Sequence, residues 1–245
     1  GITNFHFEVA ADLLNEEELE LIESMRPGLI QLEIGVQSTN EQTIREIRRT
    51  MRFEEVARIV QRINQGENVH QHLDLIAGLP YEDIKSFRKS FDDVYSMRPD
   101  QLQLGFLKVL KGSYMQEMQQ EYELRYKDEP PYEVLSTKWL PYSDVIELKG
   151  IEEMVEIYYN SGQFTHVVEA LVENYASAYQ MYQDLWQYYE EHDYMGIQPR
   201  RSARYEIVLD FVKEKYPEQA DVMRELLTYD YYLRENAKSR PEFAG

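Results

Sequence analysis

Four short segments of the chain alternate apolar and polar residues, and each predicts a β-strand. Side chains alternate between the two faces of a strand with a period of two, so each strand has one apolar and one polar face. Segments with helical periodicity separate the four strands, which is the pattern of parallel βαβ units. The predicted strands are Phe5–Ala10, Leu29–Gln37, His70–Gly78 and Asp100–Val109.

The polar face of these strands carries Glu, Asp, His and Gln residues. Parallel sheets normally have both faces covered by apolar contacts, so we interpret this face as the wall of a cavity that holds a polar ligand. Ligands of parallel α/β folds bind at the carboxyl ends of the strands. The candidates there are Glu8, Gln37, Asp74 and Gln103, and Arg49 adds a guanidinium that suits a carboxylate.

Four parallel strands make an incomplete sheet. A closed (β/α) barrel needs eight strands, and four strands are also two thirds of a six-stranded open barrel. Both sheet edges would be exposed, which proteins usually avoid. The fold class predicted is therefore α/β, a partial (β/α) barrel completed by further strands that precede this segment in a longer protein.

After the fourth strand the pattern changes to helical. Residues 111–128 are predicted to be a polar helix, with breaks at Glu129–Tyr132 and Trp139–Pro141. Beyond residue 150 the whole chain has helical periodicity, and the seam from Phe164 to Tyr189 has alternating spacings of four and three, typical of a bundle. The predicted division is a partial barrel at 1–112, a connecting segment at 113–149 and an all-helical domain at 150–245.

Charge and composition exclude several classes of protein. The net charge is −19 over 245 residues, which repels nucleic-acid phosphates. No apolar run reaches the roughly 18 residues that a membrane helix needs, and no secretory signal is recognisable. We expect a cytoplasmic protein that binds neither nucleic acid nor a membrane. The chain has no cysteine, which excludes disulfides and thiolate ligands within it.

The histidines raise the question of a metal. His6 and His72 are predicted to share one face, but no third ligand stands out at a convincing spacing, so no metal site is assigned. Together with Glu33 and Gln103 these histidines are predicted to line a substrate pocket. A metal-dependent hydrolase using His6, His72 and Asp74 remains an alternative.

Three motifs in the first half of the chain resemble the radical S-adenosylmethionine (SAM) superfamily. They are Gly35-Val36-Gln37-Ser38, the helix Ile44–Arg49, and Leu73-Asp74-Leu75-Ile76-Ala77-Gly78-Leu79-Pro80. The branch most similar contains oxygen-independent coproporphyrinogen III oxidase and the cobalamin-domain proteins. The resemblance covers roughly residues 1–115 well. Residues 130–136 and the helical tail are similar to an uncharacterised domain appended to some cobalamin-binding members.

This resemblance implies roles for five residues. Glu8 and Asp74 correspond to carboxylates near the ribose of SAM, and Gln37 to a glutamine near its methionine part. Arg49 corresponds to the arginine that pairs with the SAM carboxylate, and Ile76 would pack against the adenine. The four strands would be the later strands of a six-stranded barrel.

The chain departs from the family in three places. The CxxxCxxC loop that holds the 4Fe–4S cluster, the glycine-rich strand that binds the methionine amino group, and the proline that often follows the strand-end glutamate are all absent. The resemblance therefore implies a fragment that supplies part of the SAM and substrate pocket and is inactive alone. The parent protein would hold the cluster and would supply the missing N-terminal strands. It would also hold cobalamin if it has a cobalamin domain. The expected substrate is a small molecule. The alternative is a non-catalytic protein, a degenerate half-barrel that binds a nucleoside-like ligand or a partner.

Overall fold

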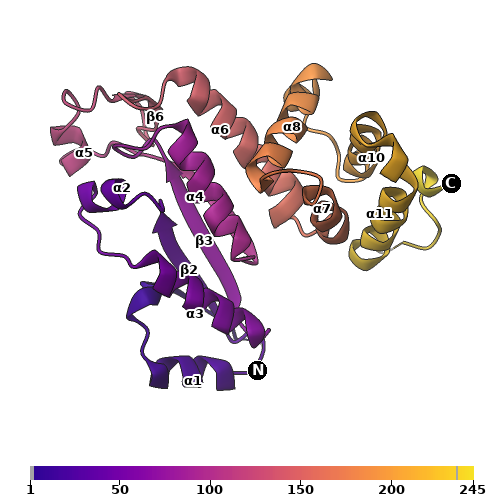
Figure 1. The fold of residues 1–245 in the computed structure, drawn as a ribbon, viewed down its shortest axis with the longest axis horizontal. Helices are drawn as coiled ribbons and strands as arrows, with labels where there is room; N and C mark the ends of the chain where they lie inside the picture. Colours follow the sequence, from indigo (N-terminus) through magenta and orange to yellow (C-terminus); the bar gives the residue numbers. More distant parts are fainter. Residues whose placement is uncertain (1–2, 236) are drawn as a thin grey trace. The chain divides into compact units, whose positions relative to one another are not determined.

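The computed structural model describes residues 3–235 and 237–245, and the chain divides into two compact units, Gly1–Lys149 and Gly150–Gly245 (Figure 1). The first unit is an α/β unit, and the second is helical. A partial barrel-like parallel sheet followed by a helical region confirms the predicted fold class.

A four-stranded parallel sheet forms the first unit, in the order β1-β2-β3-β4. All four strands lie where the alternation predicts them, with ends shorter by up to three residues. The strands are β1 (Phe5–Val9), β2 (Ile30–Gln37), β3 (His70–Ala77) and β4 (Gln101–Phe106). The helices between them are η1 (Ala11–Leu13), α1 (Glu16–Ser24), α2 (Glu41–Glu46), α3 (Phe53–Gln65) and α4 (Ile84–Ser96).

The helices of this unit begin where side chains can bond to their free amide groups. Asn15 and Glu18 form the capping box that the sequence predicts at the start of α1. The side chains of Asn40 and Asp83 accept hydrogen bonds from the first turns of α2 and α4. These caps fix the point at which each connection after a strand becomes helical.

The apolar face of the sheet packs against α3 and α4. Alternate residues of β2 and β3 are buried, including Ile34 and Leu73. Gln71 also points to this side, where its Nε2 donates to the Val60 carbonyl of α3 at 3.0 Å. The opposite residues of the same strands are half-buried or exposed, so the sheet has one packed face and one accessible polar face.

Strand β1 differs from the others because its apolar side chains are accessible to solvent. Phe5 and Phe7 are 51% and 49% exposed, although both lie in register with buried residues of β2. β1 is one of the two edge strands of the sheet, the other being β4. The alternation thus predicted the strand and placed Phe5 and Phe7 on its apolar face. Whether these two rings are buried depends on what covers this edge of the sheet.

The segment after β4 is not the polar helix that the sequence predicts. It contains the short helix α5 (Tyr114–Glu117) and the strands β5 (Arg125–Tyr126) and β6 (Val134–Ser136), which pair antiparallel. Glu123 has a left-handed backbone, with φ of 51°, and a helix cannot continue through such a residue. Tyr122 and Leu124 on either side of it are buried, so tertiary packing decides the conformation here.

The second unit is a set of packed helices. They are α6 (Tyr142–Val155), which begins in the first unit and continues into the π-helical turn Glu156–Asn160, then α7 (Thr165–Val172), α8 (Ala178–Glu191), α9 (Tyr194–Ile197), α10 (Ala203–Lys215), η3 (Pro217–Gln219), α11 (Ala220–Arg234) and η4 (Glu242–Ala244). The seam from Phe164 to Tyr189 is divided between α7 and α8. The side chain of Ser177 caps α8 and so begins a new helix within an unbroken apolar pattern.

No helix in the described part of the chain combines the length and the apolar composition that crossing a membrane requires.

A buried polar network joins the connections that follow β2 and β3. Ser38 donates to Glu82 Oε1 at 2.6 Å, and Ser90 of α4 donates to the same oxygen at 3.0 Å. Glu82 is 1% exposed, and its Oε2 has no hydrogen-bond partner among the described residues. Burial raises the pKa of Glu82 to about 7, although the serine hydroxyls oppose that shift. Ser38 therefore has a structural role beside the polar face.

Because the pKa of Glu82 is higher in the folded chain than in the unfolded chain, its ionisation destabilises the fold as the pH rises from about 4.5 to 7. Replacing Glu82 by Gln keeps the accepting oxygen and removes the charge. We compare the free energy of unfolding of Glu82→Gln with that of wild type at each pH. We expect this difference to favour the variant by about 2 kcal/mol more at pH 8 than at pH 5. Urea unfolding followed by circular dichroism measures this. Glu121→Gln, at an exposed position, is the control; an equal pH response in both variants would contradict the prediction.

Candidate functional site

The ladder of the sheet brings predicted site residues from β1 to β4 onto one face. Glu8 lies opposite Glu33, and Glu33 lies opposite His72. One step further toward the carboxyl ends, Asp74 lies between Gly35 of β2 and Gln103 of β4. The alternation thus predicted correctly that these side chains share a face, because the register keeps equivalent positions in line.

Arg49 reaches this face from the segment after α2. A Cβ atom placed on Gly35 would lie 3.3 Å from Arg49 Nη1 and 3.6 Å from Asp74 Oδ1. The guanidinium and the carboxylate therefore both lie beside Gly35, where a side chain would crowd Arg49. Arg49 and Asp74 form the part of the predicted site that the structure brings together at the carboxyl half of the strands.

The electrostatics of Asp74 are those of a buried carboxyl group among other charges. The pKa of Asp74 is raised to about 6: burial is the main cause and the neighbouring carboxylates Glu33 and Glu8 add to it, whereas Arg49 and a backbone hydrogen bond at Val36 oppose it. Its Oδ1 is buried without a hydrogen-bond partner among the described residues. Such an oxygen can accept a hydrogen bond from a ligand at little additional desolvation cost.

Gln37 lies at the carboxyl end of β2, beyond the Arg49–Asp74 pair. The ladder shifts register between Gly35 and Gln37, and Gln37 has φ of 65°. A left-handed backbone at a residue other than glycine costs about 1 kcal/mol or more, and such residues cluster at ligand sites. The side chain of Gln37 is half-buried.

Ile76, Gln103 and Glu8 lie at the margins of this arrangement. Ile76 is half-buried on the polar face, and its partner across the ladder is Gly105, which adds no side chain above it. Gln103 and Glu8 are exposed. Ile76 therefore has no neighbouring side chain at its ladder partner in β4, whereas Glu8 and Gln103 are accessible to solvent.

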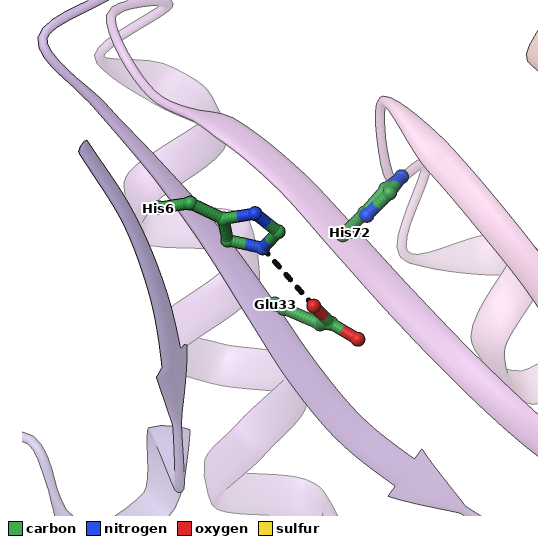
Figure 2. A group of neighbouring side chains, drawn as sticks. All are labelled: His6, Glu33 and His72. Carbon is green, nitrogen blue, oxygen red and sulfur yellow. Dashed lines mark ion pairs between the residues drawn. The ribbon is translucent and has the colours of Figure 1, made fainter. Parts of the chain in front are cut away.

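His6, Glu33 and His72 form a second group on the same face, nearer the amino ends of the strands. Figure 2 shows the three side chains projecting from β1, β2 and β3. His6 Nε2 lies 3.0 Å from Glu33 Oε2, and one ligand atom from each residue lies within 4.8 Å of the others. The sequence grouped these residues in a substrate pocket but did not recognise Glu33 as the third member of a compact triad.

Sequence reasoning missed an aromatic cluster next to the carboxyl ends of the strands. The ring of Tyr81, which follows β3, lies 4.6 Å from that of Trp139 and 6.3 Å from that of Tyr122. The hydroxyls of Tyr122 and Tyr114 both donate to the Glu46 carboxylate and lower its pKa. Tyr114, Tyr122 and Trp139 come from the predicted connecting segment 113–149, and nothing in its pattern predicts that they pack near Tyr81 and Glu46.

The residues of this face fit one of the two groups that the radical SAM resemblance implies. The Arg49 guanidinium, the buried Asp74 Oδ1 without a partner among the described residues, and the half-buried side chain of Ile76 suit SAM. A 4Fe–4S cluster needs thiolate ligands, and the chain contains no cysteine, so these residues do not fit the cluster.

Comparisons with known proteins assign the chain to a family whose description names no activity. No curated protein matches the chain. Among solved structures, the coproporphyrinogen III oxidase of Escherichia coli, described as a radical SAM enzyme, is similar over 65% of this chain with 19% sequence identity and a TM-score of 0.42. The match covers 32% of that enzyme, so the chain spans about a third of its length. A family model described as a protein of unknown function, DUF4080, matches residues 120–245, which is more than half of the chain, and the chain therefore belongs to this family.

Proposed function

We propose that residues 1–112 form part of the SAM-binding pocket of a radical SAM enzyme of the oxygen-independent coproporphyrinogen III oxidase type. The observation that carries this proposal is that the Arg49 guanidinium and the Asp74 carboxylate both lie beside Gly35, at the carboxyl half of the parallel strands. The GVQS and DLIAGLP motifs contribute Gly35 and Asp74, so the motif resemblance and the geometry support the same site.

Each part of SAM has a chemical counterpart among these residues. The Arg49 guanidinium suits the methionine carboxylate, as a charge-assisted hydrogen bond of this kind is strong. Asp74 suits a ribose hydroxyl, with Glu8 further along the same face, and Ile76 suits the adenine ring. The carboxylates of this face also favour the sulfonium cation of the ligand. In this superfamily SAM supplies an adenosyl radical that abstracts hydrogen from a substrate.

The remaining strands, and the cysteines for the cluster, are proposed to come from another part of a longer protein. The accessible edge of β1 supports this, because the exposed rings of Phe5 and Phe7 would be buried by a further strand and its helix. His6, Glu33, His72 and Gln103 would then line the substrate chamber. Only the family resemblance suggests that this longer protein also contains a cobalamin domain.

A non-catalytic half-barrel that binds a nucleoside-like ligand is the second candidate. Such a protein would need no cluster, and therefore no cysteine from another part of a longer protein. The two candidates share the ligand site and differ in whether the longer protein cleaves SAM.

Reconstitution of an iron–sulfur cluster distinguishes these candidates. We expect the 245-residue chain to bind no cluster and to produce no 5′-deoxyadenosine from SAM under reducing conditions, because it has no thiolate ligand. The full-length parent should produce it. Turnover by this chain alone would contradict the fragment proposal, and inactivity of a reconstituted parent would favour the non-catalytic candidate.

The ligand site is tested by calorimetric titration of the chain with S-adenosylhomocysteine. We expect Arg49→Ala and Asp74→Asn each to weaken binding at least about tenfold, since each removes a charged hydrogen-bonding partner. Binding to wild type should weaken as the pH falls through about 6, where Asp74 gains a proton, and Asp74→Asn should lack this step. Arg45→Ala, which removes an exposed arginine of α2 four residues before Arg49, is the matched control. Equal losses in Arg45→Ala and Arg49→Ala would overturn the assignment.

Gly35 provides a test that leaves every charged group in place. In Gly35→Ala the new methyl group would lie 3.3 Å from Arg49 Nη1, so the guanidinium must move. We expect binding of S-adenosylhomocysteine to weaken about fivefold to tenfold while the fold is retained. The control is Gly196→Ala, where a Cβ atom meets nothing within 4 Å. Unchanged affinity in Gly35→Ala would show that the position of Arg49 does not determine binding.

A further inference from the structure

We infer that His6, Glu33 and His72 form a binding site for a divalent transition-metal ion. One nitrogen or oxygen atom from each residue lies within 4.8 Å of the other two, and the three residues come from three neighbouring strands (Figure 2). The inference does not depend on SAM binding, because it concerns residues other than Arg49, Asp74 and Ile76 and a different ligand.

The spacing of the ligand atoms suits coordination to one ion. With metal–ligand bonds of about 2.0–2.2 Å, atoms at adjacent coordination positions lie roughly 3.0–3.5 Å apart. The 3.0 Å between His6 Nε2 and Glu33 Oε2 is already in this range. The third ligand, from His72, needs a side-chain rotation that shortens its separation by little more than 1 Å.

The backbone holds the three residues in place without a metal. Glu33 and His72 are direct partners in the β2–β3 ladder, and His6 lies opposite Gln31, two residues before Glu33. Ligands mounted on paired strands are positioned more exactly than ligands on loops. The site is therefore preorganised by the sheet.

An unpaired nitrogen provides an independent reason to expect a ligand here. The Nε2 atom of His72 is buried and has no hydrogen-bond partner among the described residues. A buried polar atom without a partner is unfavourable, and a metal bond to this nitrogen, after the ring rotates toward His6 and Glu33, would satisfy it. The nearest other histidine ring on this strand, His70, has its centroid 5.7 Å away.

The ligand types indicate the class of metal. Two imidazoles and one carboxylate suit borderline ions such as Zn²⁺ or Fe²⁺, whereas Mg²⁺ and Ca²⁺ prefer oxygen ligands. Three protein ligands leave coordination positions open for water or a small molecule. The additional carboxylate of Glu8, opposite Glu33 in the ladder, increases the negative potential that attracts a cation.

Zn²⁺ alone is the probe, in equilibrium dialysis of the 245-residue chain against a competing chelator at pH 7.5. We expect one Zn²⁺ per chain, and at least about tenfold weaker binding in His6→Ala, Glu33→Gln and His72→Ala. The matched control is His70→Ala, which removes a histidine from the same strand outside the triad and should bind within about twofold of wild type. Circular dichroism verifies that each variant is folded.

Two results would overturn the site: no stoichiometric Zn²⁺ on the wild-type chain, or equal weakening by His70→Ala and His72→Ala. If a variant fails to fold, the remaining two substitutions decide, since each removes a ligand from a different strand. The dialysis contains no SAM or analogue, so the metal site and the SAM site succeed or fail separately.

Discussion

The parallel ladder between β2 and β3 is the interaction on which both candidate sites depend. It pairs Glu33 with His72 and Gly35 with Asp74, and the period of two sends all of these positions to the same face. Because the intervening residues are buried against α3 and α4, a shift of register by one residue would bury the polar side chains. Packing of the apolar face thus determines which residues lie on the polar face.

The connections that follow the strands are held by polar contacts inside the fold. Ser38, Glu82 and Ser90 link the connection after β2 to α4, and the buried carboxyl group of Glu82 is a costly member of that network. The GVQS motif therefore has two parts with different roles: Gly35 makes room on the polar face, whereas Ser38 anchors the backbone beside it. A substitution in this motif can affect the site or the fold according to its position.

The polar face combines two chemically distinct regions. Toward the amino ends of the strands, imidazoles and a carboxylate form a compact group suited to a cation. Toward the carboxyl ends, Arg49 contributes positive charge above Gly35 and beside Asp74. The two regions share the electrostatic field of Glu8 and Glu33, which raises the pKa of Asp74. A ligand that bridges both regions would meet a cation-binding end and a carboxylate-binding end.

The sequence by itself determined the four strands, their parallel βα connections, the helical second half and the set of residues on the polar face, because each follows from local periodicity and capping. Only the tertiary structure decided that Arg49 lies beside Gly35, that Glu33 joins His6 and His72, and that the polar segment after β4 is not one continuous helix. Those outcomes depend on register, on left-handed residues such as Glu123 and on packing between segments far apart in the chain. Periodicity carries no information about such long-range contacts.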